Sequence, residues 1–97
     1  MLAIDWGGEG RVVLSGRLDA SQASAAQAFL DRAQGRVTLD CTALEYISSP
    51  GLGVLLKTQK RLSAGGGGLR LSGVNRHLRD ILSYSGFDQI FEIDPAG

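Results

Sequence analysis

Hydrophobic and polar residues alternate in several short stretches of the chain, and this pattern predicts β-strands. The stretches are residues 2–6, 11–15, 36–41, 69–73 and 89–94. Gly-Gly-Glu-Gly separates the first two stretches, so these two read as a hairpin. The pattern therefore predicts a sheet of about four to five strands.

Three segments between the strands have hydrophobic residues at helical spacing. The residues that define these faces are Ala23, Ala26, Leu30 and Ala33 in the first segment, Leu52, Leu55, Leu56, Gln59 and Leu62 in the second, and Val74, Leu78, Ile81 and Leu82 in the third. Asp19 or Ser21 is placed to cap the first helix, and Gly86 is the expected C-cap of the third. Strands that alternate with helices predict an α/β fold with parallel crossovers.

Length and charge narrow the classes of protein that the chain can belong to. With 97 residues, of which 43% are hydrophobic, the chain predicts one globular domain over residues 1–97. A formal net charge of zero argues against direct nucleic-acid binding and against a membrane-surface anchor. Asp5 interrupts the first hydrophobic stretch, so no signal peptide is expected. The single cysteine, Cys41, fits a reducing compartment, and we expect a cytoplasmic protein.

The candidate catalytic and metal-binding residues do not form a recognisable site. Ser49 lacks the preceding glycine of a nucleophile elbow, and the only histidine, His77, lies in the last helical segment. The acids before or after strands, Asp5, Asp19, Asp40 and Asp94, show no ligand spacing. We therefore expect no enzyme, no cofactor and no metal, and keep a small hydrolase as an alternative.

The segment Ser48-Ser49-Pro50-Gly51, in front of the second helix, admits two interpretations. Pro50 suits the first helical position, which makes Ser49 the expected N-cap and leaves Ser48 in the preceding loop. Gly51 and Gly53 each cost a helix about 1 kcal/mol relative to alanine. The cap explains Ser49 and Pro50 but not the two glycines, whereas a bare backbone allows a partner protein to approach the serine closely.

Three stretches of the chain together resemble one known family. LDCTALEYISSPGLGVLLKTQKRL resembles the signature of STAS domains, specifically of bacterial anti-sigma factor antagonists. SGRLDA is similar to the segment that follows the family's second strand, and NRHLRDILSYSGFDQIFEI is similar to its last helix and strand. The resemblance implies a single STAS domain: a mixed sheet with three to four helices packed mainly on one face.

The resemblance also implies a function. Such an antagonist binds an anti-sigma factor that is itself a serine kinase, whose own site holds the ATP. Phosphorylation at the start of the helix releases the kinase, and a serine phosphatase resets the antagonist. Carried over by position, the phosphoacceptor is Ser49 and the family's loop aspartate is Asp19. The partner-binding residues are then Asp19, Ser48, Ser49, Pro50, Gly51 and Gly53.

Two positions depart from the family pattern. Ser48 stands where one subfamily has an acid, and Pro50 stands where serine or alanine is usual. Because a proline beside the acceptor can hinder a kinase, a second function stays open. In that alternative the STAS domain is not phosphorylated and serves as a scaffold or as a subunit of a transport complex.

Overall fold

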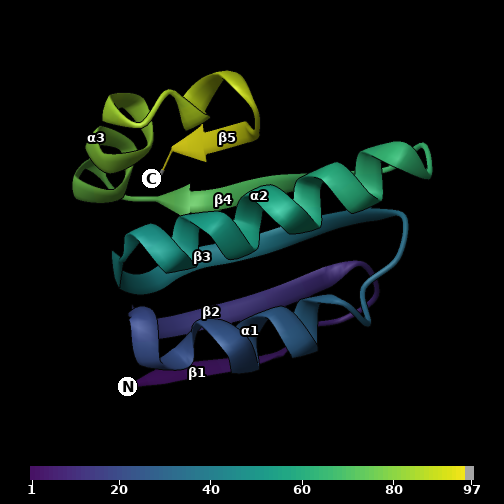
Figure 1. Ribbon diagram of the computed structural model, residues 1–97, viewed down its shortest axis with the longest axis horizontal. Helices are drawn as coiled ribbons and strands as arrows, with labels where there is room; N and C mark the ends of the chain where they lie inside the picture. The colour runs from purple at the N-terminus through teal and green to yellow at the C-terminus, as the bar shows by residue number, and fades with distance from the viewer. Residues whose placement is uncertain (96–97) are drawn as a thin grey trace.

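Five strands form one mixed sheet, and their order in the sheet is their order in the chain (Figure 1). In this computed structural model, which describes residues 1–95, the strands are β1 (Leu2–Trp6), β2 (Arg11–Leu18), β3 (Arg36–Ile47), β4 (Gly68–Val74) and β5 (Glu92–Pro95). β1 is antiparallel to β2, and the other neighbours are parallel. The predicted mixed α/β sheet is confirmed. The last two residues of the predicted 1–97 domain lie outside the described residues.

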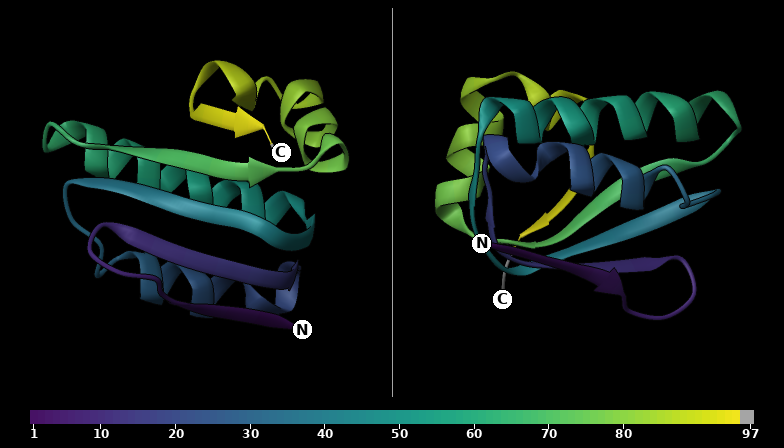
Figure 2. Two further views of the ribbon diagram at one scale, coloured as in Figure 1. Left: turned by 180° about the vertical axis from the view of Figure 1, so that it is seen from behind. Right: turned by 60° about the horizontal axis from the view of Figure 1, so that its bottom comes forward.

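The helices lie on one side of this sheet. They are α1 (Ala23–Leu30), α2 (Ser49–Ala64) and α3 (Arg76–Tyr84), with short 3-10 helices η1 (Ala20–Gln22) and η2 (Phe87–Gln89). α1 and α2 run side by side against one face, and α3 lies near the end of β4 (Figures 1 and 2). Sequential strand order explains this one-sided arrangement, because right-handed crossovers in the same direction place each helix on the same face.

The core lies between that face and the helices. Alternate strand residues point into it, and helix residues meet them there; the fully buried large side chains include Val12, Leu14, Leu30, Leu39, Leu55 and Leu71. Cys41 also points into this core, where burial raises the pKa of its thiol to about 12. A thiol in this environment stays protonated and unreactive at neutral pH.

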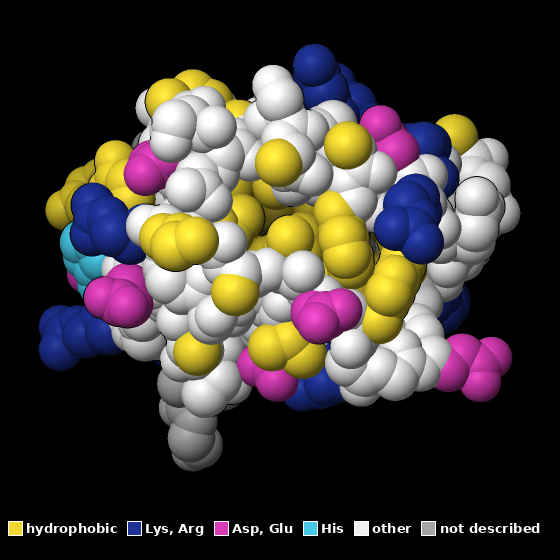
Figure 3. Space-filling view, turned by 90° about the horizontal axis from the view of Figure 1, so that it is seen from below, with side chains coloured by type: hydrophobic (Ala, Val, Ile, Leu, Met, Phe, Trp, Pro, Cys, Tyr) yellow, Lys and Arg dark blue, Asp and Glu magenta, His cyan; other side chains and the backbone are white. Residues whose placement is uncertain are grey.

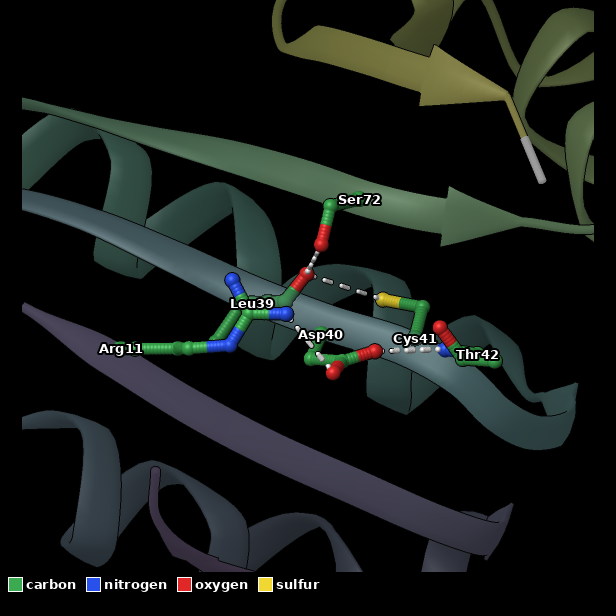
Figure 4. A network of polar contacts seen from close by, with 6 residues as sticks. All are labelled: Arg11, Leu39, Asp40, Cys41, Thr42 and Ser72. Carbon is green, nitrogen blue, oxygen red and sulfur yellow. Dashed lines mark hydrogen bonds and ion pairs between the residues drawn. The ribbon is translucent and has the colours of Figure 1, made fainter. Parts of the chain in front are cut away.

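The opposite face of the sheet carries a polar network centred on Asp40 (Figure 4). The backbone N–H of Thr42 donates to Asp40 Oδ1 at 3.0 Å, and Arg11 Nη2 donates to Asp40 Oδ2 at 2.8 Å. Hydrogen bonds from Thr42, followed by the one from Arg11, hold the pKa of the Asp40 carboxyl below its ordinary value. Asp94 likewise pairs with Arg70 at 2.5 Å. Over the described residues, no group of three or more potential ligands could hold a metal ion.

Several predicted boundaries were wrong. β2 continues from residue 15 to Leu18, and β3 continues from residue 41 to Ile47. Val74 ends β4 and does not begin α3, which is capped by Asn75. Residues 87–89 form a 3-10 helix, so the last strand starts only at Glu92. The predicted C-cap was wrong by one residue, because Ser85 is the C-cap of α3 and Gly86 follows it with φ of 74°.

Candidate functional site

The adjacent ends of β2 and β3 bring two predicted site residues together. The backbone N–H of Ser48 donates to the carbonyl oxygen of Leu18 at 2.9 Å, which continues the pairing of these strands by one residue. Asp19 follows Leu18, and Ser49 follows Ser48. Both residues therefore leave the sheet from the same edge, one into η1 and the other into α2.

Ser48, and not Ser49, caps α2. Ser48 has extended backbone angles, φ of −89° and ψ of 171°, and its Oγ accepts a hydrogen bond from the Gly51 N–H at 3.2 Å. Its side chain is buried. The expectation that Ser48 lies in a loop was therefore wrong, because the pairing with Leu18 makes it the last extended residue before the helix.

Ser49 is the first helical residue, and it is exposed. Pro50 is therefore the second helical residue. The sequence had indicated that it would be the first. Proline fits there as well, because the first-turn N–H groups have no intrahelical acceptor. This shift by one residue engages the Ser48 hydroxyl in the cap and leaves the Ser49 hydroxyl at the surface, next to the positive end of the helix dipole.

The two glycines of the first turns have different roles. A Cβ on Gly51 would lie 2.8 Å from Leu18 Cγ and 3.0 Å from the Leu18 carbonyl oxygen. Gly51 is therefore needed where α2 passes close to the end of β2. A Cβ on Gly53 would have no atom within 4 Å. Packing thus explains Gly51, whereas only the bare surface at Gly53 still fits the interpretation that a partner approaches here.

Gly53 faces an open groove of about 550 Å³ between α1 and α2. The groove is lined by Pro50, Gly53, Val54 and Lys57 from α2 and by Ala23, Ser24, Gln27, Ala28 and Asp31 from α1 and its C-cap. The sequence did not predict the α1 residues or Lys57 as part of a site. The spacing of residues 50, 53, 54 and 57 is that of one helical face, and it was the signal that could have identified this groove.

Asp19 is held by a local turn. Its Oδ1 accepts from the Ser21 hydroxyl at 2.7 Å and from the Ser21 N–H at 3.1 Å, so Asp19 caps η1. These hydrogen bonds, aided by the positive charge of Arg17, lower the pKa of the Asp19 carboxyl. Asp19 is therefore a fixed negative charge at neutral pH. It caps η1, whereas the N-cap of α1, the helix that Asp19 or Ser21 was expected to cap, is Gln22.

An arginine and a tyrosine lie beside this edge and were missed from the sequence. Arg17 and Tyr46 pair across β2 and β3, and the Arg17 guanidinium carbon lies 4.4 Å from the centre of the Tyr46 ring. This geometry is that of a cation–π contact. Both residues lie in the strand segments beyond the predicted strand ends, which is why the alternation pattern did not place them.

His77 is exposed on α3, whereas the Ser48 hydroxyl is engaged in the helix cap. None of the helices in residues 1–95 is long and hydrophobic enough to cross a membrane. The site is thus an exposed serine at a helix start, an ordered carboxylate beside it and an open groove.

A five-stranded mixed sheet with its helices on one face and an exposed serine after its third strand agrees with one known family. Residues 2–93 match the family described as Mlab, STAS domain, and the chain belongs to this STAS family.

Relatives agree with this assignment. BtrV of Bordetella bronchiseptica, assigned as an anti-sigma factor antagonist, is 41% identical over 64 residues, which are 66% of this chain and 55% of BtrV. The chain thus spans little more than half the length of that relative. An assigned anti-sigma factor antagonist of Thermotoga maritima has a similar fold, with a TM-score of 0.80 and 22% identity, over 98% of this chain and 86% of its own. The anti-sigma factor antagonist SpoIIAA in its unphosphorylated form gives a TM-score of 0.75 and 19% identity, over 96% and 87% of the two chains.

Proposed function

We propose that this chain is an anti-sigma factor antagonist controlled by phosphorylation of Ser49. Unphosphorylated, it binds an anti-sigma factor serine kinase, which supplies the ATP site, and frees that kinase's other client. Phosphorylation releases the kinase, and a serine phosphatase resets the cycle. The observation that carries this proposal is the exposure of Ser49 at the start of α2, next to a Ser48 hydroxyl that is already engaged.

The predicted partner-binding residues divide by role in this proposal. Ser49 is the acceptor, and Asp19 is a fixed charge that orients the acceptor or contacts the kinase. Pro50 and Gly53 line the open groove and offer a surface with little side-chain bulk. Ser48 and Gly51 act through the shape of the helix start, because both are buried.

The switch is electrostatic. A phosphoserine carries about −1.5 to −2 charges at neutral pH. At an exposed helix N-terminus this charge is favourable by about 0.3–1 kcal/mol, so the free domain keeps its fold. In a complex the same charge, buried without a partner, costs on the order of several kcal/mol, which is orders of magnitude in affinity. The larger effect is thus at the interface.

The test pairs the chain with each ATP-binding anti-sigma factor of its source genome. We expect one of them to bind the chain and, with ATP, to add one phosphate, detected by intact mass and mapped to Ser49. Ser49→Ala should abolish the mass shift, and Ser48→Ala should keep it. If no such protein binds or phosphorylates the chain, the proposal is wrong and the scaffold or transport-complex alternative gains support.

A further inference from the structure

The outer edge of β1 carries peptide groups that the described sheet does not use. Within residues 1–95, β1 pairs with β2 alone. At the two ends of β1, the Arg17 N–H donates to the Met1 carbonyl oxygen and the Gly7 N–H donates to the Arg11 carbonyl oxygen. Because hydrogen-bonded positions alternate along an antiparallel pair, the odd-numbered residues of β1 bond to β2. The peptide groups of the even-numbered residues, Leu2, Ile4 and Trp6, therefore point outward, away from β2.

The side chains of the same even-numbered residues form a hydrophobic patch. Leu2 and Ile4 are only partly buried, and Trp6 is 41% exposed. The Trp6 and Phe29 rings lie 4.9 Å apart, which links the strand to α1. Figure 3 shows this side of the molecule, where hydrophobic side chains gather in the middle and charged ones lie mainly around them. An exposed tryptophan in such a patch is typical of a protein interface.

We propose that a second copy of this chain covers this edge. In this dimer the two β1 strands pair antiparallel about a two-fold axis at Ile4. Ile4 then faces Ile4 of the second copy, and Leu2 faces Trp6 of the second copy. This register uses the outward peptide groups of all three even-numbered residues and continues the sheet from one copy into the other.

The sequence of β1 is complementary to itself in this register. On the helix side every cross-strand pair is hydrophobic. On the other side Ala3 faces Asp5 of the second copy, so no two like charges stand opposite each other. β1 also has none of the lysines or prolines that commonly protect an edge strand. A net charge of zero adds no repulsion between copies. These features favour a second copy over an unrelated strand.

Two contacts compete with the pairing and keep it weak. The Leu2 N–H donates to Gln22 Oε1 at 2.8 Å, and the Trp6 N–H donates to Asp5 Oδ1 at 2.9 Å. Both hydrogen bonds must exchange for interstrand ones, whereas no hydrogen bond is recorded for the Ile4 N–H within the described residues. We expect a dissociation constant of about 10 μM to 1 mM, as for small, transient interfaces.

The dimer leaves the Ser49 edge open. Leu2 pairs with Gly16, near the end of β2 that leads to Asp19. Since Leu2 faces Trp6 of the second copy, the two Ser49 sites lie at opposite ends of the paired strands. The dimer therefore presents two separate sites, and its existence does not depend on whether Ser49 is phosphorylated.

The test compares two substitutions at one exposed position. Ala3 is exposed on the uncovered face, so neither Ala3→Lys nor Ala3→Glu disturbs the core. The two-fold axis creates two contacts between position 3 of one copy and Asp5 of the other. Ala3→Lys puts an opposite charge in both contacts, and Ala3→Glu puts a like charge in both. Sedimentation velocity of the purified chain over a concentration series should show a weak dimer. Ala3→Lys should tighten it and Ala3→Glu should weaken it, each by roughly three- to tenfold.

The outcomes decide the proposal. Thermal melts of all three proteins at low concentration establish that the monomer fold is unchanged. A wild-type chain that stays monomeric at about 1 mM, the weak end of the expected range, overturns the dimer. A dimer that responds equally to lysine and glutamate overturns the β1 register. A dimer that Ala3→Lys tightens and Ala3→Glu weakens supports both, and the reverse order overturns the register.

Discussion

The guanidinium of Arg61 on α2 donates a hydrogen bond to the carbonyl oxygen of Leu30, the last residue of α1, at 2.9 Å. A second bond, to the carbonyl oxygen of Ala33, is 2.8 Å long. The Leu30 carbonyl lies at the C-terminal end of α1, where a cation is favourable, and the Ala33 carbonyl lies in the segment just beyond the helix. One arginine therefore caps α1 and ties it to α2 on the far side of the groove from Ser49.

We predict that Arg61→Met destabilises the domain by about 1–2 kcal/mol, because two carbonyl oxygens lose a charged donor. Lys60→Met is the matched control, since Lys60 is exposed on the same helix and has no recorded hydrogen bond within residues 1–95. Urea unfolding measures both variants. Equal stability of the two variants would mean that the Arg61 contacts add nothing.

The two serines at the start of α2 should respond differently to alanine. Ser48→Ala removes the cap on the Gly51 N–H and should cost about 0.5–2 kcal/mol of unfolding free energy. Ser49→Ala should change stability by less than about 0.5 kcal/mol, because Ser49 is exposed. Chemical denaturation of the unphosphorylated proteins checks this. The reverse order would contradict the assignment of Ser48 as the cap.

The two glycines form a second matched pair. Gly51→Ala should destabilise by about 1–3 kcal/mol, because its Cβ would collide with Leu18. Gly53→Ala should stabilise by roughly 0.5–1 kcal/mol, since the site is open and alanine favours a helix. If the partner uses the groove, Gly53→Ala should bind more weakly although it is more stable. Unchanged binding of a stabilised Gly53→Ala protein would remove Gly53 from the interface.

A negative charge at position 49 should leave the melting temperature within a few degrees of wild type. The charge lies at a helix N-terminus, where it is slightly favourable, and about 1 kcal/mol shifts the melting temperature of a domain of this size by about 4–8 °C. Ser49→Asp, measured by calorimetry, tests this, with Ser49→Asn as the neutral control. A much lower melting temperature for the aspartate alone would show that the switch unfolds the helix start.

Asp40 should make the fold sensitive to acid. Its folded-state pKa lies below the ordinary value of 3.8, so its contribution is present above that pH and is lost as the pH falls through the folded pKa. Asp40→Asn should therefore be less stable than wild type at neutral pH and lose less stability on acidification below about pH 4. Unfolding free energies across this range, with Asp19→Asn for comparison, measure the effect. Parallel curves for wild type and Asp40→Asn would refute it.

The sequence predicted the types of the elements because the periods of two and of about 3.6 residues are well separated in this chain. It did not predict where β3 ends. Alternation breaks at Thr42 and Ala43, which are both exposed, and Leu44 and Ile47 are then buried three residues apart. The break arises because the pairing of β3 with β2 shifts register twice, between Val13 and Ser15 and between Gly16 and Arg17. Only pairing with a distant strand keeps the chain extended there, and a local pattern does not show such pairing.

Pairing between β2 and β3 also explains why the N-cap of α2 is Ser48 and not Ser49, the residue expected from the sequence. Ser48 and Ser49 are equally good caps by sequence, and Pro50 tolerates both arrangements. The bond between Ser48 and Leu18 decides between them, and it requires the two strand ends to meet. The family resemblance assigns the acceptor to Ser49 by motif, and this stays a prediction, whereas the local helix rules placed the cap one residue too late.

Strand order also has a consequence for how the chain folds during synthesis. Because each strand pairs with the strand before it, the growing chain adds one strand at a time to an existing edge and never has to insert a strand between two others. Such neighbour-to-neighbour pairing closes shorter loops than pairing between strands far apart in the chain would. Within the described sheet, each new strand covers one edge of the strand before it, so the outer edge of β1 is exposed from the moment β1 is made and no later strand covers it.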